Sequence, residues 1–210
     1  MKSEVFQAIQ EIEGLSKQLE ALGYPTSRMK RFPCESEESI RAVEMSTGMS
    51  VPAELRKFLQ TVGGMYLRID VDGLAITYYD RPTCPQPIGG LADVLDGCWM
   101  WNEYREEDEL PEDAIETLNR EFVCFGHCEC TENSSDHFFY DRNGKLGVLH
   151  FDQEFLREDA WEHLLQLCTG TNPQPAMSLD EILLARLPRA KSTTSWLLDA
   201  VKERIGADGG

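Results

Sequence analysis

The chain has 210 residues, and its 37 Asp and Glu against 20 Lys and Arg give a formal net charge of −17 at pH 7. A surface this negative repels phosphate backbones and anionic lipid head groups, which argues against nucleic-acid binding and electrostatic membrane docking and favours a basic partner. The length suggests one domain with an appendage, and the hydrophobic share of 41% is enough for a core.

The sequence indicates a cytoplasmic protein with reduced thiols. It contains no run of 18 or more apolar residues, and Met1 to Glu4 opens a charged, helix-patterned stretch in place of the apolar core of a signal peptide. The seven cysteines are odd in number and scattered, which argues against a secreted disulfide framework in a chain of this length.

The N-terminal part predicts three helices. Apolar residues at steps of three and four predict the first over residues 5–22. After a basic, turn-rich patch at residues 27–33, a serine cap followed by two acids predicts the second over residues 36–48. A proline at the start and a glycine pair at the end predict the third over residues 52–64.

From residue 65 onward the apolar period changes to two. Residues 66–71 and 74–79 predict two strands joined by Asp72-Gly73, a strong hairpin turn signal. Three further strands are predicted at residues 122–128, 137–140 and 146–151, the last two joined by a turn at 141–144. Together these five strands predict one antiparallel sheet.

Four more helices complete the expected elements. Helical spacing of apolar residues predicts helices over residues 91–104 and 160–170. The tail predicts two amphipathic helices, at residues 179–187 after a serine cap and at 194–205 after a proline-containing break.

The stretch from Ile40 to Gly64 resembles the N-terminal signature of the SUKH superfamily, which includes the Smi/Knr-type proteins. That signature has a Glu on the first helix, a Gly, an apolar residue and Pro opening the next helix, then an apolar pair and an Asn-Gly or Gly-Gly corner. The corresponding residues are Glu44, Gly48, Val51, Pro52, Phe58, Leu59, Gly63 and Gly64. Residues 122–126, and 137–141 with 147–152, resemble the second half of the family, so the resemblance covers roughly residues 36–170.

The resemblance implies an α+β fold in which helices pack on a strongly bent antiparallel sheet of about five strands. We expect residues 1–30 to form an N-terminal amphipathic helix, 31–170 the SUKH-like domain and 171–210 a C-terminal helical extension. The motif residues, together with Asp141 of the final hairpin, are interpreted as structural.

The resemblance also implies a non-enzymatic role. Bacterial members are similar to immunity proteins that bind and neutralise polymorphic toxins, often nucleases, and fungal members regulate cell-wall glucan synthesis. The leading hypothesis is therefore an immunity protein that blocks a basic toxin by occlusion. A regulatory scaffold of the Smi/Knr type is the alternative.

The acidic segment at residues 101–121 is the predicted partner-binding region. It contains nine acids against two arginines and follows a group of aromatic residues. Exposed Trp and Tyr beside carboxylates can anchor an interface and steer a basic partner onto it. The candidate partner-binding residues are Trp99, Trp101, Tyr104, Glu106, Glu107, Asp108, Glu109, Glu112 and Asp113. A solvated acidic loop that serves solubility, with a tryptophan buried in the core, is the alternative.

Four possible zinc ligands lie within seven residues: Cys124, His127, Cys128 and Cys130. Structural zinc sites usually pair a close cysteine couple with a second couple a dozen or more residues away, so His137 and His150 could complete the set only through the fold. On a regular strand the three cysteines share one face and His127 faces the other. We therefore predict cysteines packed as small hydrophobes, with no metal and no cofactor.

A zinc-binding or thiol-dependent enzyme is the other alternative. Cys128, His150 and Asp152 supply the residue types of a nucleophile, a base and an orienting acid, but no local motif singles them out. The sequence contains no phosphate-binding glycine loop and no His-Glu-x-x-His pattern. We therefore predict no catalytic residues.

Overall fold

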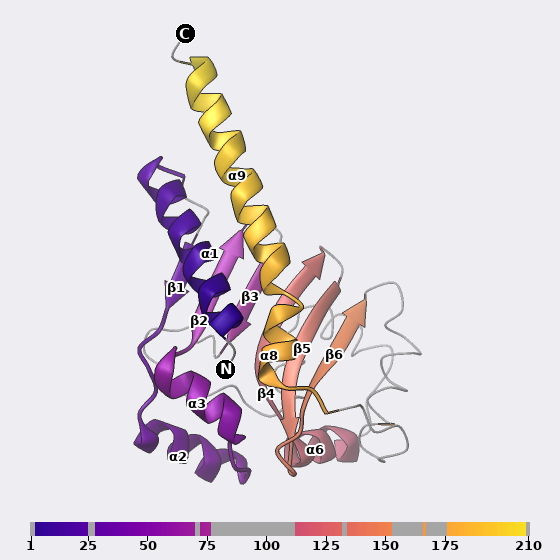
Figure 1. Ribbon diagram of the computed structural model, residues 1–210. Helices are drawn as coiled ribbons and strands as arrows, with labels where there is room; N and C mark the ends of the chain where they lie inside the picture. Colours follow the sequence, from indigo (N-terminus) through magenta and orange to yellow (C-terminus); the bar gives the residue numbers. More distant parts are fainter. Residues whose placement is uncertain are drawn as a thin grey trace.

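The computed structural model describes residues 3–24, 28–69, 72–76, 112–131, 134–152, 166 and 176–208. Within them the chain forms six helices and one six-stranded antiparallel sheet (Figure 1). The strands are β1 (Arg28–Arg31), β2 (Met65–Ile69), β3 (Asp72–Ile76), β4 (Phe122–Thr131), β5 (Ser134–Asp141) and β6 (Leu146–Asp152). The helices are α1 (Ser3–Ala21), α2 (Glu37–Thr47), α3 (Ala53–Thr61), α6 (Glu112–Glu121), α8 (Leu179–Leu184) and α9 (Leu187–Asp208). The predicted α+β class with an antiparallel sheet is confirmed.

The expectation of about five strands in a strongly bent sheet is wrong. Across the described residues six strands pair in the order of the sequence, without a strong bend (Figure 1). The additional strand, β1, lies in the basic patch that predicts turns. Four residues with three basic side chains carry no alternating pattern, so the strand is decided by its pairing with β2, from Arg28 opposite Arg68 to Arg31 opposite Met65.

The hairpin between β2 and β3 turns two residues earlier than predicted. Ile69 pairs with Asp72 and Arg68 with Gly73, so Asp72-Gly73 lies inside β3 and the connection falls at residues 70–71. The Asp-Gly signal is local, whereas the register of this hairpin must also fit β1 on one side and β4 on the other.

Helices α1, α8 and α9 cover one face of the sheet (Figure 1). The apolar stripe predicted for α1 is confirmed, because Val5, Ile9, Ile12 and Leu19 are fully buried. These residues share one core with α2, α3, the sheet, α8 and α9. The N-terminal helix and the C-terminal helices therefore pack into the same core as the sheet.

The first tail helix begins with a capping box, and the second tail helix begins earlier than expected. The Ser178 hydroxyl accepts the Glu181 backbone N–H at 3.2 Å, and the Glu181 carboxylate accepts the Ser178 N–H at 2.8 Å, as the serine cap predicts. The prediction of a second helix starting at residue 194 is wrong, since α9 begins at Leu187. Pro188 lies in its first turn, where a missing N–H costs nothing.

The second face of the sheet is also buried at β4, β5 and β6. Phe122 and Phe139 meet edge to face at a centroid distance of 5.3 Å, and Cys124 and Leu149 are buried on the same side. The helices predicted at 91–104 and 160–170 lie outside the described residues, apart from Gln166, which is helical.

Candidate functional site

The corner between α2 and α3 is organised by one carboxylate. Glu44 of α2 accepts the backbone N–H of Val51 at 2.9 Å and forms a charged hydrogen bond with Arg56 of α3. The guanidinium of Arg56 also binds both carboxylate oxygens of Glu37 at 2.8 Å. Gly48 ends α2 with a left-handed φ of 67°, which lets the chain turn toward α3. Glu44 thus ties the two helices together.

The glycine pair at the end of α3 makes a close backbone approach possible. Gly63 has a φ of 80°, and a Cβ there would lie 2.5 Å from the carbonyl oxygen of Phe32 and 2.8 Å from that of Pro33. The carbonyl of Gly64 accepts the N–H of Phe32 at 2.9 Å. Any side chain at Gly63 would collide with the incoming backbone.

The remaining motif residues also have structural positions. Pro52 is the N-cap of α3, and Phe58 and Leu59 are buried in the core. The carboxylate of Asp141 accepts the backbone N–H groups of Asn143 and Lys145, each at 2.8 Å, and so holds the β5–β6 turn.

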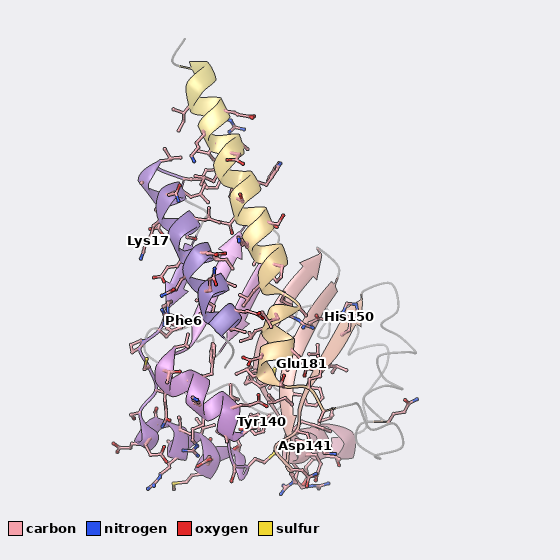
Figure 2. The ribbon with its side chains drawn as sticks, in the orientation of Figure 1. Phe6, Lys17, Tyr140, Asp141, His150 and Glu181 are labelled. Atoms are coloured by element: carbon pink, nitrogen blue, oxygen red, sulfur yellow. The ribbon has the colours of Figure 1, made fainter. Side chains whose placement is uncertain are left out.

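The β5–β6 turn lies between the start of α3 and the end of α6, and α2 and α6 lie at this same end of the sheet (Figures 1 and 2). A Cβ at Gly144 would lie 3.9 Å from Pro52 at the start of α3, and Arg142 forms an ion pair of 3.3 Å with Glu121 at the end of α6. We call α2, α6 and the turn at residues 141–145 the α2–α6 end. Its two helices carry seven acidic residues against two basic ones, a higher density of negative charge than the chain average.

The α2–α6 end also presents an apolar side chain. Met45 of α2 is 85% exposed, with the exposed carboxylate of Glu38 two turns before it on the helix. Methionine is enriched at protein interfaces because its flexible side chain adapts to different partners. Carboxylates around an exposed apolar side chain are suited to binding a basic protein surface.

Tyr140 lies in the core next to Glu44 and Thr47 of α2 and packs against this end of the molecule. Its side chain is fully buried, and burial raises the pKa of its hydroxyl to about 12, with the nearby carboxylate of Glu44 adding to the rise. The hydroxyl is therefore neutral at any physiological pH and acts as a packing group.

Most of the predicted partner-binding residues lie outside the described part of the chain. These are Trp99, Trp101, Tyr104, Glu106, Glu107, Asp108 and Glu109. Glu112 and Asp113 form the first turn of α6, where acidic residues complement the helix dipole as well as any partner. Sequence reasoning missed the part contributed by α2, because its acids were interpreted only as helix caps and motif residues.

The cysteines of β4 do not share one face, so that prediction is wrong. Cys124 lies opposite Phe139 and Cys128 opposite Asp136, and an irregularity between Cys124 and Gly126 shifts the register by one residue. A β-bulge of this kind reverses which residues face each side of a sheet. Cys124 is buried, and burial raises the pKa of its thiol to about 12, so it stays a neutral packing group. The side chains of His127 and Cys130 lie outside what the structure describes.

A row of three chemically active residues crosses the other face of β4, β5 and β6. Cys128 pairs with Asp136, which pairs with His150. The Asp136 carboxylate lies 2.7 Å from Nδ1 of His150 and also binds Arg186 at the α8–α9 joint at 2.5 Å. A thiol nucleophile needs the histidine next to the cysteine, whereas here Asp136 separates the two. The side chain of Asp152 lies outside the described residues.

No group of three or more His, Cys, Asp or Glu side chains is arranged to hold a metal ion in the described part of the chain. Among the described helices, none is both long and apolar enough to cross a lipid bilayer. No protein-family model, curated protein or solved structure matches the chain significantly.

Proposed function

We propose that this chain is a SUKH-type immunity protein of the cytoplasm that neutralises a basic toxin, of the nuclease class, by occlusion. The observation that carries the proposal is the α2–α3 corner. Glu44, Gly48 and Gly63 stand at positions of the SUKH-like signature. Glu44 accepts the Val51 N–H, Gly48 ends α2 in a left-handed conformation, and Gly63 allows the close approach of the backbone at Phe32. Non-enzymatic binding is the role that the resemblance implies.

The proposed mechanism is charge pairing followed by steric block. A nuclease holds its substrate phosphates with Lys and Arg, and carboxylates of the α2–α6 end occupy these groups in place of nucleic acid. Met45 supplies exposed apolar area that becomes desolvated in the complex. The net charge of −17 accelerates encounter with a basic partner.

The proposal predicts a gene for a basic toxin beside the gene for this chain, and it is tested with that toxin domain. Increasing amounts of the purified protein are added to the toxin while its nuclease activity is measured. We expect complete inhibition at one equivalent of the chain. A toxin that stays active, or the absence of any complex with it, would refute the immunity reading and favour the Smi/Knr-type scaffold instead.

The predicted acidic segment is tested separately. Replacing Glu106, Glu107, Asp108 and Glu109 with Ser removes four negative charges. If this segment takes part in binding, the association rate falls and depends less steeply on ionic strength. An unchanged rate and salt slope would leave binding to the α2–α6 end alone.

A further inference from the structure

Helix α9 carries one large apolar side chain on its outer surface. Trp196 is 69% exposed, whereas the neighbouring Leu197 and Leu198 and the preceding Thr194 are buried against the rest of the molecule. An indole ring buries roughly 150–250 Å² when it enters an interface. Tryptophan is also the residue type most enriched among interface hot spots.

The surface around Trp196 is suited to a second helix. Residues three and four positions away lie on the same face of a helix. On α9 these are Ser192, Thr193, Asp199 and Ala200, none of which has a large side chain. Small neighbours allow a partner helix to approach closely on both sides of the indole ring.

The charge of this region differs from that of the rest of the chain. From Ser178 to Gly210 five basic residues balance five acidic ones, although the whole chain has a net charge of −17. Two copies of an acidic protein repel each other through most of their surfaces. The tail is neutral, so contact through α9 avoids this repulsion, and neutrality also gives the tail no preference for a basic partner.

One pair of opposite charges on α9 is placed symmetrically about Trp196. Arg189 lies seven residues before it and Glu203 seven residues after it, which is two helical turns in each direction. In an antiparallel pair of helices related by a two-fold axis at Trp196, Glu203 of each copy therefore lies opposite Arg189 of the other. This one pair of positions is self-complementary.

We propose that α9 is a homodimerisation surface on which two copies pack antiparallel around Trp196. The two indole rings meet at the two-fold axis and fill the space above Ser192 and Ala200 of the other copy. Two Glu203–Arg189 pairs set the register. The contact is small, so the dimer is of the weak, reversible class.

The proposal is tested by sedimentation equilibrium of the full chain from about 10 μM to about 500 μM, the range in which small interfaces assemble. We expect a reversible monomer–dimer equilibrium. Trp196→Ala raises the dissociation constant at least about tenfold, as loss of a hot-spot side chain does. Met45→Ala removes a more exposed side chain from α2 and serves as the matched control. We expect it to leave the dissociation constant of the homodimer unchanged.

The register is tested by exchanging charges. Glu203→Arg places two like charges opposite each other and raises the dissociation constant at least about threefold. The double variant Arg189→Glu with Glu203→Arg restores the dissociation constant to within about twofold of its original value, because the charge pairs are re-formed with reversed sign. A chain that stays monomeric throughout, or a dimer insensitive to Trp196→Ala, would overturn the proposal. Failure of the double variant to restore association would overturn the antiparallel arrangement.

Discussion

Gly63 shows how one residue fixes the path of the chain at the end of α3. Its positive φ and the backbone oxygens at 2.5 and 2.8 Å leave no room for a side chain. We expect Gly63→Ala to lower the free energy of unfolding by about 2–4 kcal/mol, measured by urea denaturation, because both strain and a backbone clash are introduced. Gly14→Ala is the matched control. Gly14 lies in α1 with no atom within 4 Å of a Cβ, so this change should stabilise the protein by about 0.5–1 kcal/mol.

Glu44 is the second residue on which the α2–α3 corner depends. Glu44→Ala leaves the Val51 N–H without its acceptor and removes one partner of the half-buried Arg56. We expect a loss of about 2 kcal/mol in the free energy of unfolding, since both a hydrogen bond and a charge pair are broken. Glu38→Ala on the exposed face of α2 should change stability by less than about 0.5 kcal/mol. Equal effects of the two substitutions would show that Glu44 has no special structural role.

At the scale of elements, Asp136 joins β5, β6 and the α8–α9 joint. Arg186 binds its carboxylate, stacks over the ring of Phe138 at 5.0 Å and donates to the carbonyl of Ile182 at 2.9 Å. His150, visible beside the joint in Figure 2, binds the other carboxylate oxygen. This one side chain therefore fastens the C-terminal helices to the sheet.

The same carboxylate predicts a pH dependence of stability. Burial raises the pKa of Asp136, but the hydrogen bond with His150 and the charge of Arg186 lower it by more, so the pKa lies below its usual value. A folded-state pKa below the unfolded value contributes stability above about pH 4 that is lost as the pH falls further. We expect Asp136→Asn to lower the free energy of unfolding by about 2 kcal/mol at pH 7 and by less at pH 3. Urea denaturation at both pH values measures this, and an equal loss at both would contradict it.

Local signals predicted the elements that depend on local chemistry. The stripe of α1, the Ser36 and Ser178 caps and the Gly48 stop could be assigned from sequence, since each acts within a few residues. The strand β1, the register of the β2–β3 hairpin and the bulge in β4 could not, because pairing with a neighbouring strand decides them.

The candidate site was predictable only in part, for the same reason. The acids of α6 belong to the segment that the sequence marks as strongly acidic. The place of α2 at the same end of the sheet as α6, by contrast, depends on the α2–α3 corner and on the β5–β6 turn, which approaches Pro52 on one side and pairs with Glu121 on the other. A contact such as that between Pro52 and Gly144, which are 144 − 52 = 92 positions apart, leaves no local pattern in the sequence.

At the scale of the whole molecule, α1 and the first half of α9 share one core with the sheet. Lys191 of α9 pairs with Glu11 of α1 at 2.5 Å, and Ile9, Ile182 and Leu198 are buried in one cluster. We expect a single cooperative unfolding transition in which the amide hydrogens of α1, β5 and the first half of α9 exchange together. Hydrogen exchange measured by mass spectrometry checks this, and earlier exchange of α9 would show that the tail folds independently.

The central claim is that the α2–α6 end binds a basic toxin. The most direct measurement is the association rate between the chain and the basic toxin that the proposal predicts, as a function of ionic strength, for two double variants that each remove two exposed carboxylates. Glu38→Ser with Glu116→Ser changes the α2–α6 end, and Glu4→Ser with Glu20→Ser changes α1. We predict that the first variant lowers the rate at least about threefold at low salt and flattens its salt dependence, while the second has a much smaller effect. Equal effects of the two variants would contradict the claim, because they would show that net charge alone, and not the α2–α6 end, attracts the partner.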